Sequence, residues 1–313
     1  MLANRLRRVH RHLRKWARRT NVTCYRLYDR DIPEHPLVVD WYEGRALVYA
    51  MHRKKDETEA DQEAWLREVD TEVREGLEID EEQLFFKERR RQKGLDQYQK
   101  EADEHQEFIV GEQGHRFWVN LSDYHDTGLF LDHRTTRRMV QEEAAGKRFL
   151  NLFAYTGSFT VYAAAGGATE SLTVDISNTY LAWAARNFEL NGVDPAPHRR
   201  ERADALTWLP QAVASGRQWD LIVCDPPTFS NSKKMRDTLD VGERHPDLIN
   251  NCLRLLSPGG VLYFSTNFRT FKLQEEALLP CGLEEITRKT IPPDYENSRG
   301  TLIHRCWRLT HPV

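Results

Sequence analysis

Hydrophobic residues recur at intervals of three and four near the start of the chain. Leu2, Leu6, Leu13 and Trp16 fall on one side of a helical repeat, which predicts an amphipathic helix over residues 2–19. Short runs with strand-like composition follow, and Gly-containing turns separate two pairs of them. The strands are expected at 23–28, 37–42, 46–51, 108–110 and 117–121, and a second helix at 57–75.

The pattern changes near residue 123, where apolar strands begin to alternate with amphipathic helices. Alternation of this kind is typical of a mostly parallel, doubly wound sheet. We therefore expect a small α+β domain at residues 1–122 and a Rossmann-like α/β domain with a seven-stranded sheet at residues 123–313. Its strands are expected at 148–153, 170–175, 198–203, 219–224, 260–266, 283–289 and 301–309, and its helices at about 133–145, 158–166, 178–191, 204–214, 242–256 and 273–280.

Three of the expected strands end in loops that could bind a ligand. The first loop is Asn151–Gly157, the second begins with Asp175, and the third is Asp225–Phe229. In an open α/β sheet, ligands bind at the carboxyl ends of strands, near the point where the strand order reverses. The first loop lacks the glycine spacing of a dinucleotide site. Such loops would instead suit methyl transfer from S-adenosylmethionine (SAM), which needs a nucleoside cofactor and a second substrate.

Two aspartates at strand ends have both a binding and a structural interpretation. Asp175 closes the second strand, where a carboxylate can accept both hydroxyls of a ribose. Asp204 follows the third strand and could accept the amino group of an adenine. Each could instead cap the helix that follows it, since Asp is favoured at that position.

The third loop combines a carboxylate with two prolines. Pro226 and Pro227 have fixed φ angles and no amide hydrogen, so neighbouring carbonyls are left to face a site beside Asp225. Such a loop could accept hydrogen bonds from the edge of a base, with Thr228 next to it and Phe229 offering a stacking face. The alternative is a rigid turn without a ligand.

The formal net charge of −3 hides a strong asymmetry along the chain. Residues 2–19 contain many cations and no acid, and a second basic cluster spans residues 87–93. Phosphates respond to local positive potential, so an RNA partner is compatible with a near-neutral total. A solvated helix face is the simpler alternative. The candidate RNA-binding residues are Arg7, Arg11, Arg14, Arg18, Arg89, Arg91, Lys93 and Lys233.

Composition excludes several other classes of protein. The five cysteines are an odd, scattered set without close pairs, which argues against a disulfide framework and a zinc site and fits a cytoplasmic location. No apolar run approaches the roughly 20 residues that span a bilayer. We expect neither a membrane partner nor a metal.

Four stretches of the chain match a known enzyme family. They are Arg91–Lys100, Asp126–Arg134, Asn151–Gly157 and Asp225–Lys233, and the last two are specific. With them the chain resembles the class I SAM-dependent methyltransferases, in particular the RlmK family of bacterial 23S rRNA guanine-N7 methyltransferases. In many bacteria this enzyme is the C-terminal half of a bifunctional protein. The resemblance implies SAM as cofactor, 23S rRNA in an unfolded or pre-ribosomal state as partner, and in some cases fusion to a guanine-N2 methyltransferase module.

The resemblance also implies a set of site residues. The helix that begins near His133 would present its positive N-terminus to the SAM carboxylate. From spacing alone, His133 and Arg134 would be expected on a helix surface. The implied cofactor-binding residues are Asp132, His133, Arg134, Asn151, Ala154, Tyr155, Thr156, Gly157, Asp175, Ile176, Ser177, Asp204, Ala205 and Asp225, and the implied catalytic loop is Asp225, Pro226, Pro227, Thr228 and Phe229.

The residues narrow the choice of target atom without settling it. Methylation of cytosine C5 requires a thiolate that adds to the ring. The places where such enzymes carry their cysteine hold Thr228 and Ser265–Asn267, and Cys224 lies within an apolar strand where an inert core residue is expected. Guanine N7 and guanine N2 would both suit the loop, and N7 rests on the resemblance. A catalytically silent RNA-binding assembly factor is the remaining alternative.

Overall fold

The structure is a computed structural model that describes residues 1–51, 58–88, 106–230, 239–296 and 300–312. It divides into two compact units, Met1–Thr127 and Gly128–Val313, which we describe separately. No helix in the described ranges is long and apolar enough to cross a membrane.

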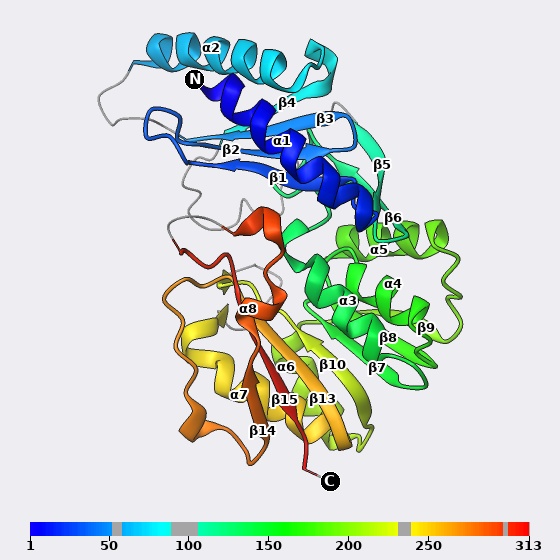
Figure 1. The fold of residues 1–313 in the computed structure, drawn as a ribbon. Coiled ribbons are helices and arrows are strands. Elements are labelled where there is room, and N and C mark those ends of the chain that lie inside the picture. The colour runs from blue at the N-terminus through cyan, green and yellow to red at the C-terminus, as the bar shows by residue number, and fades with distance from the viewer. Residues whose placement is uncertain (52–57, 89–105, 231–238, 297–299, 313) are drawn as a thin grey trace. The chain divides into compact units, whose positions relative to one another are not determined.

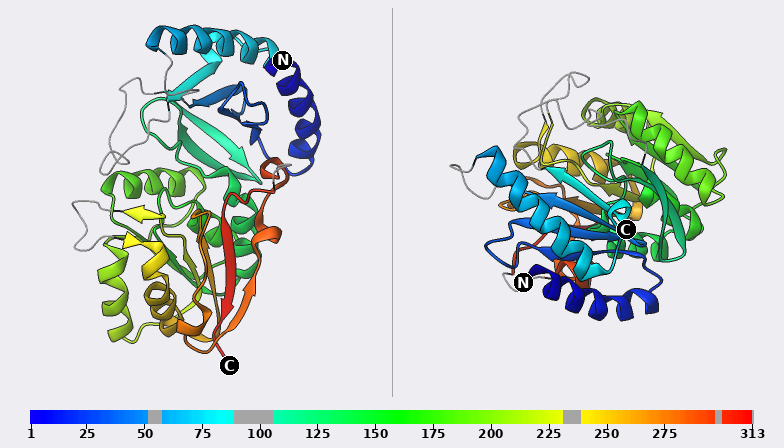
Figure 2. Two further views of the ribbon diagram at one scale, coloured as in Figure 1. Left: turned by 90° about the vertical axis from the view of Figure 1, so that its left-hand side faces the viewer. Right: turned by 90° about the horizontal axis from the view of Figure 1, so that it is seen from above.

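The first unit is a four-stranded sheet with two helices on one face (Figures 1 and 2). The strands lie in the order β1-β2-β3-β4; β1, β2 and β3 pair antiparallel, and β4 pairs parallel to β3. A separate hairpin, β5–β6, completes the unit. The elements are α1 (Leu2–Arg19), β1 (Cys24–Asp29), β2 (Leu37–Tyr42), β3 (Arg45–Ala50), α2 (Glu59–Leu77), β4 (Leu84–Glu88), β5 (Glu107–Glu112) and β6 (His115–Asn120).

The helices α1 and α2 cross closely because a glycine lies at their contact. A Cβ atom on Gly76 would come within 2.7 Å of the Ala3 backbone oxygen. The apolar stripe predicted for α1 is the face that packs, and Leu2 and Leu6 are fully buried. Thr58 begins α2 with a capping box, in which its hydroxyl accepts from the Asp61 amide.

The second unit contains a seven-stranded, mostly parallel sheet, as expected. The strand order is β14-β15-β13-β10-β7-β8-β9, with β15 antiparallel to both of its neighbours. The strands are β7 (Arg148–Leu152), β8 (Glu170–Asp175), β9 (His198–Arg202), β10 (Trp219–Cys224), β13 (Leu256–Thr266), β14 (Gly282–Glu285) and β15 (Arg305–Thr310), and the helices are α3 (Arg134–Glu143), α4 (Ser158–Ala165), α5 (Asn178–Leu190), α6 (Ala205–Ala214), α7 (Val241–Leu255) and α8 (Thr287–Thr290).

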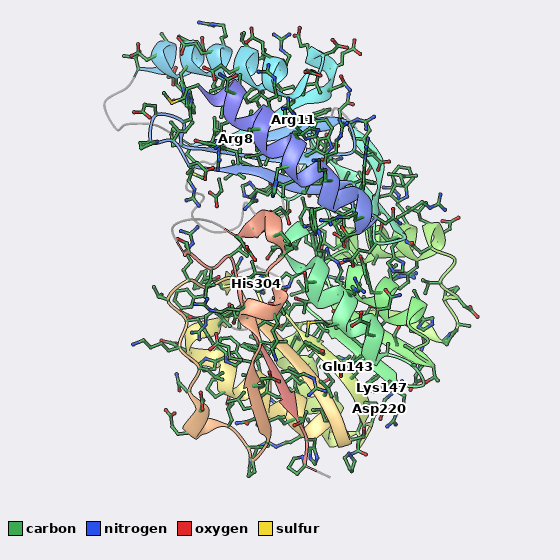
Figure 3. The ribbon with its side chains drawn as sticks, viewed as in Figure 1. Arg8, Arg11, Glu143, Lys147, Asp220 and His304 are labelled. Carbon is green, nitrogen blue, oxygen red and sulfur yellow. The ribbon has the colours of Figure 1, made fainter. Side chains whose placement is uncertain are left out.

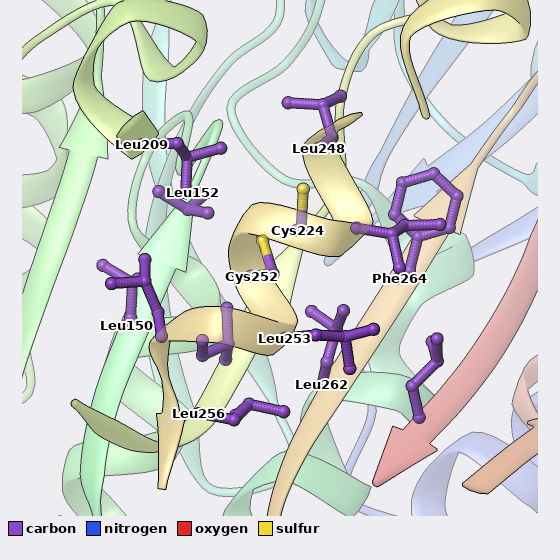
Figure 4. Close-up of a cluster of buried hydrophobic side chains, with 14 of the residues drawn as sticks. Leu150, Leu152, Leu209, Cys224, Leu248, Cys252, Leu253, Leu256, Leu262 and Phe264 are labelled. Atoms are coloured by element: carbon purple, nitrogen blue, oxygen red, sulfur yellow. The ribbon is translucent and has the colours of Figure 1, made fainter. Parts of the chain in front are cut away.

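Helices cover both faces of this sheet, and alternate strand residues point to different layers. Leu150 and Leu152 join the core formed with α6 and α7, whereas Phe149 packs with α3 and α4. Figure 4 shows Cys224 of β10 facing Cys252 of α7 within the first of these layers. All five cysteines are free, and Cys224 is a fully buried core residue, as expected, where burial raises the pKa of its thiol.

The strand order reverses between β7 and β10. From β7 the chain continues to β8 and β9 on one side, and then returns to place β10 on the other side. In this pair Leu152 is opposite Cys224, so the loops after both strands begin at the same level of the sheet. The expected loops therefore meet at the switch point.

Several sequence expectations at the edges of the elements were wrong. The helix expected at 273–280 is only a short 3-10 turn, Glu275–Ala277, with Pro280 close behind. The strand expected at 283–289 stops at Glu285 and gives way to α8, and β15 begins later than expected, at Arg305. The strand β4 and the small pair β11 (Phe229–Ser230) and β12 (Leu239–Asp240) were not anticipated.

Replacing Gly76 with alanine tests the close crossing of α1 and α2. The added methyl group would press on the Ala3 backbone, and we expect a loss of about 1–3 kcal/mol in the free energy of unfolding. Chemical denaturation measures this change. Gly111→Ala is the control, because a Cβ there meets Thr23 only at ordinary contact distance, 3.5 Å. Equal stability of the two variants would contradict the prediction.

Candidate active site

The loop after β7 has an unusual backbone. Phe153, Tyr155 and Gly157 all have positive φ values of 54°, 51° and 73°. Two of these are bulky residues in a region that L-residues rarely adopt, and such strain often accompanies a binding site. At Gly157 a Cβ would come within 2.9 Å of both Ala184 and Phe188, so the loop packs tightly on α5.

Hydrogen bonds hold this loop in its strained path. The Tyr155 hydroxyl accepts from the Gly128 amide at 2.9 Å, and the Thr156 hydroxyl donates to the Gly128 carbonyl at 2.6 Å. The Asn187 side chain of α5 donates to the Thr156 carbonyl at 3.0 Å. Asn151 lies lower in the strand, is 1% exposed and donates to Thr160.

Asp175 organises two loops at once. One carboxylate oxygen accepts from the Tyr155 amide at 2.9 Å, and the other accepts from the Ser177 amide at 2.8 Å. The helix cap of α5 is Ser177, so the alternative interpretation of Asp175 as that cap is wrong. A carboxylate oxygen has two lone pairs and can accept more than one donor, and a ribose hydroxyl is a donor of that kind.

Asp204 caps α6 with one carboxylate oxygen, and its other oxygen has no hydrogen-bond donor among the described residues. Its Oδ1 accepts from the Leu206 amide at 3.1 Å, as the structural interpretation required. Its Oδ2 is buried and has no partner among the described residues. A buried acceptor without a donor is costly, so this oxygen is well suited to bind an amino group. The binding and capping interpretations are therefore compatible here.

Asp225 follows β10, and each of its carboxylate oxygens lies near a different side chain. Its Oδ1 accepts from the Ser265 hydroxyl of β13 at 2.6 Å, and its Oδ2 lies 3.5 Å from His133 Nε2. Further along the loop, Thr228 donates to Asn267 at 2.5 Å. Phe229 is 49% exposed, which is unusual for so large an apolar side chain and leaves its ring available for stacking.

The turn before α3 is buried, contrary to the surface position expected from spacing alone. His133 and Arg134 are 5% and 1% exposed. The Arg134 guanidinium forms a buried ion pair with Asp294, a partner that no sequence pattern located. The helix α3 begins at Arg134, so its positive N-terminus lies where it was expected.

His304 is a second residue of this region that the sequence did not indicate. His304 lies in the segment before β15 (Figure 3), and its Nδ1 donates to Asp132 at 2.8 Å. Its ring stacks on that of His133, with centroids 4.4 Å apart and planes 11° from parallel. Burial lowers the pKa of His133, although the Asp225 and Asp132 carboxylates oppose that shift. The sequence offers one weak signal for His304, which is its position just before the last expected strand.

The candidate RNA-binding residues lie in different settings. On α1, Arg11, Arg14 and Arg18 are exposed, whereas Arg7 donates to the Glu75 carbonyl at 2.8 Å and helps join α1 to α2. Four candidates lie outside the described residues, namely Arg89, Arg91, Lys93 and Lys233.

Comparison with known proteins decides the family. A model of the S-adenosylmethionine-dependent methyltransferases matches residues 28–300. The chain belongs to this family, and its cofactor is SAM. A methyltransferase solved in complex with S-adenosylhomocysteine, SMU.776, superposes with a TM-score of 0.79 at 24% identity, covering 99% of this chain and 80% of that one. This match confirms the expected Rossmann-like fold.

Two curated members of this methyltransferase family are similar over the full chain. One is the ribosomal RNA large subunit methyltransferase K of Neisseria meningitidis, 49% identical over 99% of this chain and 86% of the relative. The other is the methyltransferase K/L of Methylococcus capsulatus, also 49% identical, over 100% of this chain. The chain spans only 42% of that second protein.

Replacing Asp204 with asparagine tests whether its unpartnered Oδ2 accepts the adenine amino group of SAM. Asp204→Asn keeps an oxygen to cap α6 but replaces an acceptor with an NH2 group, which would face the adenine amine. We expect SAM to bind about 5- to 30-fold more weakly by isothermal titration, equivalent to about 1–2 kcal/mol.

Asp240→Asn is the matched control for this experiment. Asp240 caps α7 through its Oδ1 in the same way, accepting from the Gly242 amide at 2.8 Å. We expect its SAM affinity to match that of the unchanged protein. An unchanged affinity in Asp204→Asn, with the helix intact by circular dichroism, would exclude the adenine contact.

Proposed function

We propose that this chain transfers a methyl group from SAM to N7 of a guanine in 23S rRNA during assembly of the large ribosomal subunit. The observation that carries the proposal is the polar, thiol-free site at the ends of β10 and β13, in a chain 49% identical to a large subunit methyltransferase K. When bound, SAM supplies a methyl group on a positively charged sulfur.

The cofactor would lie along the ends of four strands. Asp175 would accept the ribose hydroxyls, and Asp204 Oδ2 would accept the adenine amino group. The N-terminus of α3 would receive the methionine carboxylate. The strained loop Phe153–Gly157 would line the pocket between them, with its conformation maintained by Asp175 and Asn187.

The site gives no support to cytosine C5 chemistry. Thr228 and Ser265, at the places where a thiol would be needed, are hydrogen-bonded to Asn267 and Asp225. Cys224 and Cys306 are fully buried, and burial raises the pKa of both thiols. A buried neutral thiol is a poor nucleophile.

Guanine N7 fits what the loop residues can do. N7 carries an exposed in-plane lone pair and loses no proton when it is methylated, so no general base is needed. The positive charge that leaves the sulfur arrives on the guanine ring, where the Asp225 carboxylate would stabilise it. Positioning of the base against the methyl group would account for the remaining rate acceleration. Alignment of two reactants can lower the activation free energy by up to about 7–11 kcal/mol.

Guanine N2 is the second candidate, because Asp225 could orient the exocyclic amine through the same oxygens. That reaction also releases a proton, which Asp225 or His133 could accept. The two reactions therefore differ in product while using the same loop.

RNA binding would rest on the outer face of α1. Figure 3 labels Arg8 and Arg11 on this helix, and both side chains are exposed. None of the exposed α1 cations forms an ion pair with another residue in the described ranges. An unpaired exposed cation can bind phosphate without first breaking an internal contact. These cations are Arg8, Arg11, Arg14, Lys15, Arg18 and Arg19.

A base within a helix would have to leave its stack to reach the site. This costs a few kcal/mol, and less in a loop or an unfolded precursor. Stacking on Phe229 would offset part of this free-energy cost, because stacking of a base on an aromatic ring contributes about 1–3 kcal/mol to binding. An early ribosomal precursor would therefore be a better substrate than the finished subunit.

The proposed reaction is tested by locating the methyl group. The chain is incubated with labelled SAM and unmodified 23S rRNA, and the nucleosides are separated beside 7-methylguanosine and N2-methylguanosine standards. We expect label to co-elute with 7-methylguanosine. Label with the N2 standard would favour the second candidate, and label on cytidine would contradict the argument from the missing thiol.

The RNA-binding surface is tested by its dependence on salt. Replacing Arg8, Arg11, Arg14 and Arg18 together with alanine should weaken binding to rRNA fragments. The slope of log K against log salt should become shallower by about 0.7–0.9 for each phosphate that the helix no longer neutralises. Filter binding or fluorescence anisotropy over a salt series measures both effects.

Lysine at the same four positions is the matched control. It keeps the charge, so its slope should stay near that of the unchanged protein. An alanine variant whose slope equals that of the lysine variant would remove α1 from the RNA-binding surface.

A further inference from the structure

The loop that follows β10 is bonded to the end of β13 at two points. The two strands pair in parallel, so the chain leaves them side by side. Ser265 donates to Asp225 at 2.6 Å, and Thr228 donates to Asn267 at 2.5 Å. Ser265 and Asn267 are two positions apart, which is the spacing of side chains on one face of an extended chain. The loop therefore runs along the end of β13.

Asn267 lies on the open side of this arrangement. It is the first residue after β13, and its side chain is exposed. The Thr228 carbonyl accepts from the Val241 amide at 3.2 Å, and Phe229 pairs with Asp240 through the backbone. The loop is thus held at its far end as well. An exposed carboxamide and an exposed aromatic ring therefore flank the same threonine.

The bond to Thr228 determines which way the Asn267 amide faces. The Thr228 Oγ1 and the Asn267 Oδ1 are 2.5 Å apart. This distance belongs to an O–H···O hydrogen bond and is shorter than the range of about 2.7–3.2 Å for N–H···O. The amide oxygen is therefore directed at Thr228. The NH2 group is on the other side, and it has no hydrogen-bond partner in the described part of the chain.

The two contacts leave only one donor for a ligand. The Asp225 carboxylate only accepts. Ser265 and Thr228 each have a single hydroxyl hydrogen, and both hydrogens are used within the contacts. Among these four side chains, the Asn267 amide alone has hydrogens left to donate.

A donor at this position suits one edge of guanine. Guanine presents two acceptors beside each other, N7 and O6, whereas adenine presents N7 and an amino group. A loop that offered only the Asp225 carboxylate and backbone carbonyls would suit adenine better than guanine. The NH2 group of Asn267 supplies the donor that this edge of guanine needs.

We propose that Asn267 is a specificity-determining residue, which donates an amide N–H to guanine O6 while N7 receives the methyl group. Thr228 holds the amide in the required orientation. This inference rests on the proposed function, because the edge turned toward SAM must be the one that carries N7. O6 and N7 have separate lone pairs, so the bond to O6 holds the base and leaves N7 able to attack the methyl carbon.

The proposal is tested by the preference for guanine over 2,6-diaminopurine at the methylated position. This analogue keeps N7 and the 2-amino group, but it carries an amino group in place of O6 and so turns a donor toward Asn267. Two synthetic 23S rRNA fragments that differ only at this base are compared. For the unchanged protein, we expect kcat/KM to be at least about 10-fold higher with guanine. Equal values would overturn the proposal.

Asn267→Asp tests the residue itself. Aspartate keeps an oxygen for the Thr228 hydroxyl and replaces the NH2 group with an acceptor. We expect kcat/KM with guanine to fall by about 10- to 100-fold, and the preference to reverse in favour of 2,6-diaminopurine. A general loss of RNA affinity cancels in the ratio, because both fragments carry the same phosphates. A purely structural role would leave the guanine preference unchanged, and that result would overturn the proposal.

Asn251→Asp is the matched control. Asn251 lies on α7, and its Oδ1 accepts from Arg254 at 3.3 Å. The substitution therefore adds the same negative charge to a hydrogen-bonded carboxamide outside the loop. Its preference for guanine should match that of the unchanged protein.

Thr228→Val tests the orientation of the amide and serves as a second variant if Asn267→Asp does not fold. Valine has the shape of threonine without the hydroxyl, so the Asn267 amide could turn over and offer its oxygen to the base. We expect the guanine preference to decrease, with the fold intact by circular dichroism. A full guanine preference in this variant would overturn the role assigned to the bond between Thr228 and Asn267.

These measurements separate the inference from the proposed function. Product analysis of the guanine fragment shows whether the methyl group is on N7 or N2, and the preference of the variants shows whether Asn267 contacts O6. A methyl group on N2, with a reversed preference in Asn267→Asp, would contradict the proposed function alone. A methyl group on N7, with an unchanged preference, would contradict this inference alone.

Discussion

Parallel pairing of β7 with β10 is the constraint on which the candidate site depends. Hydrogen bonding in this pair sets Leu152 opposite Cys224, so the chain leaves both strands at the same level. The loop Phe153–Gly157 and the residue Asp225 are therefore neighbours for reasons of register. A slip of one residue would turn the buried side chains of either strand to the opposite layer. The buried cores on both faces of the sheet thus hold the site in place.

Acidic residues at the strand ends have structural roles in the loops, and we propose that the same residues bind SAM. Asp175 uses both oxygens to hold backbone amides, and Asp204 uses one to cap α6. Asp225 is held by Ser265. Asp204 Oδ2 has no partner among the described residues and can accept a ligand donor. This dual use preorganises the acceptors, so that less ordering is required when SAM binds.

Much of the fold could be predicted from the sequence, because the apolar patterns of the second unit are long and regular. The strands that end at Leu152, Asp175 and Cys224 were located nearly to the residue, and so were the loops after them. The residues after β13 were harder to predict. There, short apolar stretches such as 273–280 have no clear period, and Pro280 ends a helix that composition alone favoured.

The partners of the site residues could not be predicted, because they come from distant parts of the chain. The pairing of Arg134 with Asp294, and the stacking of His304 on His133, depend on how the segments after β13 return to the sheet. A histidine before a strand has no pattern of its own. The resemblance to a known family indicated His133, and only the structure brought His304 to it.

A crystal structure of the chain with S-adenosylhomocysteine would test the central claim most directly. The account predicts density along the carboxyl ends of β7, β8, β9 and β10, with the adenine amine at Asp204 Oδ2, the ribose at Asp175 and the amino-acid end at the start of α3. Density for the ligand at any other place, in crystals where these strand ends are open to solvent, would contradict it.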